Sequence, residues 1–313
     1  MPKFLISRLS ALGDTVCCLP VAVALKRQWP ACHITWVVDP RFSGVVERCT
    51  AVDKVVRAKP GFLPESWPQY AEKFDVAIDL QGLLKSALCI VRAKASRKVG
   101  YHWQREGAKL FSEAILPDPS SLHVVDQYID VARALGAETD RAEFGLVPLP
   151  EDLLSVRSKL GLAGPYAVIN AGAGWASKRW APESFGLVID RLAKAGIPSV
   201  LVGGKGDADR LAADLVRLAV KETPIDLLGQ TSIPELIALI SGAVAHVGGD
   251  TGTTHIAAAV GIPAFGIYSI TNPQRSCPYG QFDRCFYDPE ALANISPEPV
   301  VEAILSAVKE FVS

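Results

Sequence analysis

The sequence predicts an α/β protein built from two Rossmann-like, doubly wound parallel sheets, one in each half of the chain. Short apolar runs bounded by turn residues alternate with longer segments of helical periodicity, a pattern typical of parallel strands joined by helical crossovers. The 313 residues are enough for about two domains. The irregular segment EFGLVPLPE at 143–151 interrupts the alternation, so we expect one domain at 1–150 and a second at 151–313.

In the first domain, the apolar run at 4–7 predicts a strand, and the loop 8–13 leads into a helix over 14–28. Further strands are expected at 33–38, 76–79 and 99–101, and further helices from about residue 81 and over 123–135, where Gly136 is a suitable C-terminal cap.

The second domain continues the same alternation. Strands are expected at 166–170, 199–203, 225–228, 245–248 and 264–268, and helices at 152–160, 182–195, 208–219, 232–242 and 251–260. Because ligands of such folds bind beyond the carboxyl ends of the strands, we expect the functional site in a central cleft that the two domains face.

The composition excludes nucleic acid as a partner attracted by overall charge. The chain carries 32 basic and 33 acidic side chains, a net charge of −1. The positive charge is nevertheless uneven, since between Lys85 and Lys109 the only acidic residue is Glu106. This basic run is either a solvated face or a surface for an anionic acceptor.

The seven cysteines include no Cys-x-x-Cys pair, which favours free thiols in a reducing cytosol and argues against a zinc site. The N-terminus lacks the apolar core and cleavage site of a signal peptide, and no uninterrupted apolar stretch reaches about 18 residues. We therefore expect a cytoplasmic protein, with peripheral contact to a membrane left open.

The segment HVGGDTGTTH at 246–255 predicts a diphosphate site. An apolar strand ends here, and small residues let a ligand approach the unpaired N–H groups of the next helix N-terminus. His255, one turn into that helix, could donate to a phosphate oxygen. In the alternative interpretation Asp250 is only the N-cap and His255 a buried partner of a carbonyl. The candidate donor-binding residues are Gly249, Asp250, Thr251, Gly252 and His255.

The loop NAGAGWASKRW at 170–180 also follows a predicted strand. Gly174 permits a tight turn, and Lys178 and Arg179 place cationic donors near the cleft. The loop does not fit the dinucleotide fingerprint, because serine stands where its third glycine would fall. The alternative is a solvated surface loop with a packed Trp180.

The loop LVGGKGDADR at 201–210 offers carboxylates for a ribose. Asp207 or Asp209 could accept hydrogen bonds from vicinal hydroxyls, and Asp207 could equally be a plain helix cap.

In the first domain, Gly13 and Asp14 lie at the strand-to-helix turn of SRLSALGD at 7–14. The Asp14 carboxylate, dehydrated when the cleft closes, could act as a general base, or it could be an N-cap. The segment IDLQGLLKSA at 78–87 follows another strand and so lies on the same rim. The candidate acceptor-binding residues are Gly13, Asp79, Gln81, Lys85, Arg105 and His123.

The sequence contains no His-Glu-x-x-His pattern, Walker A loop or nucleophile elbow. The residues therefore favour metal-free group transfer from a nucleotide-diphospho donor.

These segments resemble the lipopolysaccharide heptosyltransferases and their relatives, glycosyltransferase family 9, over nearly the whole chain. The family's x-x-x-x-GD-x-x-x-x-x-P is matched at 9–20, its D-x-QG-x-x-KS at 79–86, its K-x-W-x-P at 178–182, its GGDTG-x-x-H-x-AAA at 248–259 and its T-x-P at 271–273.

The resemblance implies a GT-B fold and inverting transfer of a heptose from ADP-L-glycero-β-D-manno-heptose to a Kdo or heptose of the lipopolysaccharide inner core. It also implies that Asp14 is the general base, and that Lys178, the turn at 250–252 and His255 bind the diphosphate. No metal or other cofactor is then required. The anionic acceptor would place the enzyme at the cytoplasmic face of the inner membrane, and the last helix, 297–311, would return to the first domain.

Three alternatives to this assignment remain open. The same machinery could act on a protein or another surface glycan. A nucleotide-sugar epimerase of the same fold should carry further acid/base residues around the sugar, and we find no convincing set. A non-enzymatic nucleotide-binding protein would not require Asp14.

Overall fold

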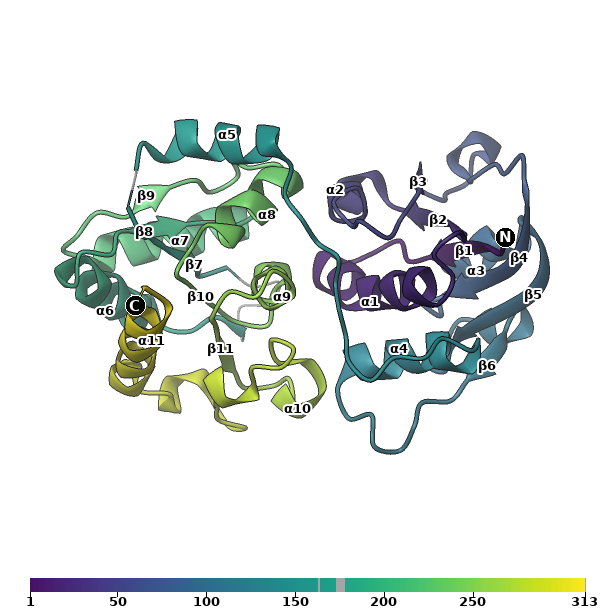
Figure 1. The fold of residues 1–313 in the computed structure, drawn as a ribbon. Helices are drawn as coiled ribbons and strands as arrows, with labels where there is room; N and C mark the ends of the chain where they lie inside the picture. The colour runs from purple at the N-terminus through teal and green to yellow at the C-terminus, as the bar shows by residue number, and fades with distance from the viewer. Residues whose placement is uncertain (163, 173–177, 313) are drawn as a thin grey trace. The chain divides into compact units, whose positions relative to one another are not determined.

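The computed structural model describes residues 1–162, 164–172 and 178–312. The chain divides into two compact units, Met1–Val147 and Pro148–Ser313. Figure 1 shows that each unit is a parallel sheet covered by helices.

The first unit has six parallel strands in the order β3-β2-β1-β4-β5-β6. The strands are β1 (Lys3–Ser7), β2 (His33–Val38), β3 (Lys54–Arg57), β4 (Lys73–Asp79), β5 (Lys94–Tyr101) and β6 (Glu113–Ile115). The helices are α1 (Leu12–Gln28), α2 (Ser43–Val46), α3 (Leu84–Val91) and α4 (Val124–Ala134), with 3₁₀ helices η1 (Pro40–Phe42), η2 (Pro64–Ser66) and η3 (Ala108–Leu110).

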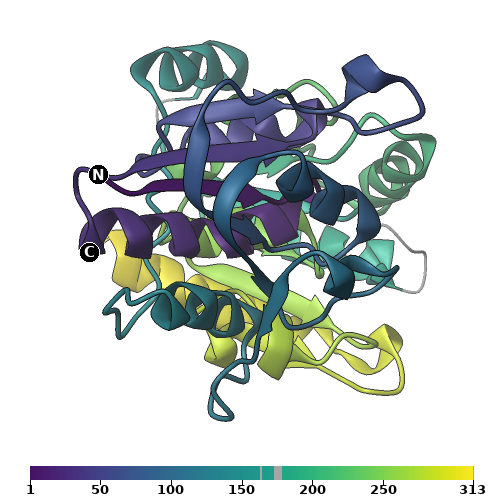
Figure 2. The same cartoon turned by 90° about the vertical axis from the view of Figure 1, so that its right-hand side faces the viewer.

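The central strands of this sheet are apolar because helices cover both of their faces. Figures 1 and 2 show α1 and α4 side by side, and these two helices pack against each other. Helix α3 packs on β1 and β4. The loops after β1 and β4 leave the same end of the sheet, because Ser7 pairs with Asp79 in the parallel ladder.

In its described residues, the second unit has six parallel strands in the order β12-β11-β10-β7-β8-β9. The strands are β7 (Ala167–Asn170), β8 (Ser199–Leu201), β9 (Ile225–Asp226), β10 (Ala245–Gly248), β11 (Ala264–Tyr268) and β12 (Cys285–Tyr287). The helices are α5 (Pro150–Leu160), α6 (Pro182–Lys194), α7 (Asp207–Ala219), α8 (Ile233–Ser241), α9 (Gly252–Ala259), α10 (Pro273–Ser276) and α11 (Pro297–Val312), with 3₁₀ helices η5 (Phe282–Arg284) and η6 (Leu292–Asn294).

The strand order of the second unit reverses direction between β7 and β10. From β7 the chain proceeds to β8 and β9 on one side, and from β10 to β11 and β12 on the other. Helix α6 packs with α7 and α11, whereas α8 packs with α5 and α9. The loops after β7 and β10 therefore lie at the topological switch point of the sheet, the usual ligand position in such folds.

Most elements lie where the sequence predicts them, and the differences have physical causes. The short strands β3, β6 and β12 were not predicted, because none contains a run of buried apolar residues. Helix α3 begins at Leu84 instead of near residue 81, because the Asp79 carboxylate holds residues 81 and 82 in a turn.

Helix α11 packs on another helix and the sheet of the second unit. Its residues Val300, Val301, Ile304 and Val308 are buried in the core of the second unit, and the helix packs against α6. This apolar side of the helix is therefore covered within the second unit.

Candidate functional site

The loops after β7 and β10 are joined by hydrogen bonds at the switch point of the second sheet. The Asn170 side-chain amide donates to Thr253 Oγ1 at 2.9 Å, and its carbonyl oxygen accepts from Gly172 N at 3.0 Å. The two strands also approach closely at Gly248, where a Cβ would lie 3.1 Å from the backbone carbonyl oxygen of Asn170. The two loops thus form one local structure.

Asp250 is the centre of a charged cluster at this point. Lys178 Nζ donates to Asp250 Oδ2 at 2.8 Å, and Thr271 Oγ1 donates to the same oxygen at 2.9 Å. His255 Nε2 lies 3.7 Å from Oδ1. Burial raises the pKa of Asp250, but His255 and Lys178 outweigh it and hold that pKa well below its usual range. The carboxylate therefore stays ionised and fixes both nitrogen-bearing side chains.

The N-cap of α9 is Thr251 and not Asp250, which contradicts the alternative interpretation of that residue. The first turn is tightened by Thr254 Oγ1, which donates to the Gly249 carbonyl oxygen at 2.7 Å. The first N–H groups of a helix have no partner within the helix and carry a partial positive charge. Helix α9 thus begins beside the Lys178 and His255 side chains with donors suited to an anion.

Three polar residues of this cluster were not among the predicted site residues. Asn170 ends β7, and Thr271 follows β11 within the T-x-P segment. His246 is fully buried, and its Nε2 lies 2.9 Å from Thr253 Oγ1. Burial, with the charge of His255, lowers the pKa of His246 to about 3, so this ring is neutral at pH 7. A polar residue at the end of a buried strand is the signal that could have identified Asn170.

Asp207 and Asp209, which follow β8, lie in different environments. Asp209 Oδ2 accepts a hydrogen bond from Gly204 N at 2.8 Å, and a Cβ on Gly172 would lie 2.5 Å from Asp209 Oδ1. Asp207 is exposed at the first position of α7, whose N-cap is Gly206. Asp209 is therefore bonded to the β8 loop and lies against the β7 loop, and Asp207 faces solvent. Gly174 lies outside the described residues.

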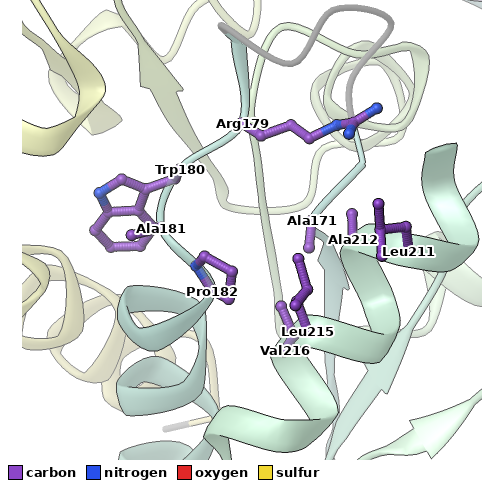
Figure 3. A pocket seen from close by; sticks show the side chains of 9 residues that line it. All are labelled: Ala171, Arg179, Trp180, Ala181, Pro182, Leu211, Ala212, Leu215 and Val216. Atoms are coloured by element: carbon purple, nitrogen blue, oxygen red, sulfur yellow. The ribbon is translucent and has the colours of Figure 1, made fainter.

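A pocket of about 170 Å³ lies beside the start of α6. Figure 3 shows Arg179 at its margin and the side chains of Leu211 and Leu215 from α7 along its apolar wall. Trp180 is buried here, donates its Nε1 to the Ile295 carbonyl oxygen at 3.0 Å and packs edge-on against Phe185. The packed Trp180 of the alternative interpretation is thus present, and it fixes the chain next to Lys178.

In the first unit, Asp14 lies in the first turn of α1 and is not its N-cap, which is Ala11. Asp14 Oδ2 accepts from the Ala11 backbone N–H at 3.3 Å and from Arg8 Nη2 at 2.8 Å. The Asp14 side chain is 51% exposed, whereas that of Arg8 is 7% exposed. Gly13 precedes Asp14 in the same turn. The Asp14 carboxylate is thus accessible to solvent, and its Oδ2 atom is held by Arg8 and the Ala11 backbone.

Asp79 and Gln81 are part of the framework beneath this turn. Asp79 Oδ1 accepts from the backbone N–H groups of Gln81 and Gly82 at 2.9 and 3.0 Å, and burial raises the pKa of Asp79. Gln81 Oε1 accepts from Leu9 N at 2.8 Å. The loop after β4 thus supports the loop that carries Asp14.

The remaining candidate acceptor residues occupy different environments. Lys85 is exposed on α3, and Arg105 is exposed with its guanidinium 5.3 Å from the centre of the Trp103 ring. The Arg105 backbone N–H donates to the Gly82 carbonyl oxygen at 2.7 Å. His123 is buried as the N-cap of α4, where its Nδ1 accepts from a backbone N–H at 3.1 Å. Lys85 and Arg105 therefore lie near the Asp79 turn, and His123 stabilises a helix end.

The part of the chain that the structure describes shows neither a metal-ligand cluster nor a membrane-spanning helix. Among residues 1–162, 164–172 and 178–312, no group of three His, Cys, Asp or Glu side chains is arranged to hold a metal ion. Within the same residues, every helix is too short or too polar to span a bilayer.

Comparison with known proteins supports the resemblance of the sequence motifs. Over 290 residues, the chain is 26% identical to the lipopolysaccharide core heptosyltransferase OpsX of Haemophilus influenzae, covering 90% of this chain and 83% of that protein. A solved family 9 glycosyltransferase from Veillonella parvula matches with a TM-score of 0.84 and 21% identity, covering 99% of this chain and 98% of that one. The Escherichia coli heptosyltransferase WaaC with ADP matches with a TM-score of 0.79 and 23% identity, covering 97% and 99%.

These structural matches confirm the expected α/β fold with two doubly wound parallel sheets, the GT-B fold. The sequence pattern of the family described as glycosyltransferase family 9 (heptosyltransferase) matches residues 70–297. The chain therefore belongs to glycosyltransferase family 9 and is a sugar-transferring enzyme.

Proposed function

We propose that this enzyme transfers a heptose from ADP-L-glycero-β-D-manno-heptose to a Kdo or heptose of the lipopolysaccharide inner core, with inversion and without a metal ion. The lipopolysaccharide core heptosyltransferase named above supports the acceptor class, and the heptosyltransferase solved with ADP supports the nucleotide. The cytoplasmic face of the inner membrane remains the proposed location.

The observation that carries the donor assignment is the Lys178–Asp250–His255 cluster beside the start of α9. A diphosphate bound there meets a lysine ammonium, the N–H groups of a helix N-terminus and a histidine ring within one loop structure. These donors can stabilise the negative charge that develops on ADP as it leaves, which is the task a divalent metal performs in other transferases. Asp207 is the exposed carboxylate that we assign to the ribose hydroxyls.

In the proposed reaction Asp14 removes the proton from the acceptor hydroxyl. The hydroxyl oxygen forms its new bond to the anomeric carbon of the heptose from the face opposite ADP. The bond between that carbon and the diphosphate oxygen breaks, and its electron pair leaves with ADP. Gly13, Lys85 and Arg105 are proposed to contact the anionic acceptor, and Asp79 and Gln81 to support the loop that carries Asp14.

The first test is calorimetric titration with ADP, UDP, GDP and NAD, each in EDTA and in magnesium. Selective binding of ADP that is equal in EDTA and magnesium is expected. Preference for UDP or GDP would contradict the proposed donor, and preference for NAD would contradict transfer from a nucleotide sugar altogether.

The second test replaces Asp14 by asparagine, which keeps the shape of the side chain and removes its basicity. Transfer should fall by about 10²- to 10⁴-fold, the usual contribution of a general base, while ADP affinity is unchanged. Full activity of Asp14→Asn would contradict the assignment of the base.

A further inference from the structure

Arg8 is a buried cation that connects Asp14 to the chain after β4 and to α4. Its Nη1 donates to the Leu80 carbonyl oxygen at 2.7 Å and to the Tyr128 hydroxyl at 3.0 Å. Its Nη2 lies 2.8 Å from Asp14 Oδ2. The planar guanidinium is thus attached to the chain after β4 and to α4, and presents its remaining edge to the proposed base.

We infer that Arg8 is a positioning residue for catalysis, which fixes one oxygen of Asp14 so that the other receives the acceptor proton. This inference rests on the proposed role of Asp14 as general base. Asp14 Oδ2 already accepts from Arg8 and from Ala11 N, so Oδ1 is the oxygen that we assign to the proton.

The burial of Arg8 gives this contact its rigidity. An exposed ion pair between two mobile side chains contributes little to orientation, because both partners rotate and are screened by water. Here the cation is held by two further acceptors and only the carboxylate is exposed. Burial also raises the pKa of Tyr128 well above its ordinary value, so its hydroxyl remains protonated and neutral beside Arg8.

Loss of Arg8 should therefore affect the chemical step more than binding. In Arg8→Met the carboxylate can turn away from its productive orientation, and kcat should fall about 10- to 100-fold. The KM for the acceptor should stay within about twofold, because the proposed acceptor contacts Lys85 and Arg105 are unaltered. The dissociation constant for ADP should also stay within about twofold, because Lys178 and Asp250 are unaltered. Arg8→Lys, which keeps the charge but lacks the fork, should recover part of kcat.

The deciding experiment is a double-mutant cycle between Arg8→Met and Asp14→Asn. Transfer is measured with ADP-heptose and with lipopolysaccharide cores that end in Kdo or heptose. If Arg8 acts through Asp14, the double variant should be no slower than Asp14→Asn alone. Arg97→Met is the matched control, because Arg97 forms an exposed ion pair with Glu113 at 2.9 Å and should leave kcat unchanged.

Different results overturn different parts of the argument. A folded Arg8→Met with kcat within twofold of the wild type overturns the inference, as does a double variant whose defect is the product of the two single defects. If Arg8→Met does not fold, Tyr128→Phe decides: a three- to tenfold fall in kcat at unchanged KM is expected, and an unchanged kcat overturns the inference. Full activity of Asp14→Asn, or no transfer by the wild type on either core, refutes the proposed function first.

Discussion

Replacing Lys178 by alanine should weaken ADP binding by about 10- to 150-fold. The Lys178 and Asp250 side chains are 26% and 21% exposed, so their ion pair is partly shielded from water. One hydrogen bond from an ammonium to a phosphate oxygen contributes about 1.5 to 3 kcal/mol, which corresponds to this change in the dissociation constant. The variant also leaves Asp250 without its nearest cation, and the negative charge of that carboxylate then opposes the diphosphate.

The structure supplies a control and a second variant for this measurement. Lys194→Ala removes an exposed lysine at the end of α6 and should bind ADP like the wild type in calorimetry at the same ionic strength. Lys178→Ala combined with Asp250→Asn should recover part of the lost affinity, because the unbalanced carboxylate is gone. A folded Lys178→Ala that binds ADP within twofold of the wild type would refute the assignment of Lys178 to the diphosphate.

Two further predictions concern stability. Gly82→Ala should lower the free energy of unfolding by at least about 2 kcal/mol, because φ is +69° and the new Cβ would lie 2.4 Å from a backbone carbonyl oxygen. Gly107→Ala, at φ +82° in open space, should lower the free energy of unfolding by only about 1 kcal/mol. Urea titration measures both variants, and equal losses of stability would show that the contact with the carbonyl oxygen is unimportant. Glu235 should stabilise the fold by about 2 to 3 kcal/mol at neutral pH, because the ion pair with Lys159 and other hydrogen bonds outweigh burial and lower its pKa from 4.5 to about 2. This contribution is complete above pH 4.5 and disappears as the pH falls toward 2, so the free energies of unfolding of Glu235→Gln and the wild type should converge at low pH. The control Glu302→Gln, at an exposed position, should match the wild type at every pH. A loss of stability in Glu235→Gln that is independent of pH would contradict the argument.

The central strands and the long helices were predictable because burial on both faces gives continuous apolar runs, as in β1, β7 and β10. The edge strand β3 was not, since the four residues of Lys54–Arg57 begin and end in a charged, exposed side chain. Its place in the sheet comes from pairing with β2. Such short strands depend on their neighbours and leave little trace in hydrophobic periodicity.

The candidate site was predictable where one rule of topology applies. Loops after neighbouring parallel strands share one edge of the sheet, so Lys178 and Asp250 could be expected to meet. The attachment of Leu9 to Gln81 spans 72 residues and depends on how two loops pack, which no local pattern records. His123 shows the opposite case, because its position directly before a helix indicates a cap more directly than a ligand contact.

The ion pair between Lys178 and Asp250 has a consequence for the kind of anion that we expect to bind at the proposed donor site. The Lys178 ammonium has a carboxylate partner at 2.8 Å, so an anion that binds to it must compete with that carboxylate. A small anion with few contacts gains little from that exchange. A diphosphate can use the ammonium and the start of α9 at the same time, and so compensates for displacing the carboxylate. We therefore expect the pair to favour ligands with several anionic oxygens over monophosphate and chloride, because the carboxylate competes with every anion for the same ammonium.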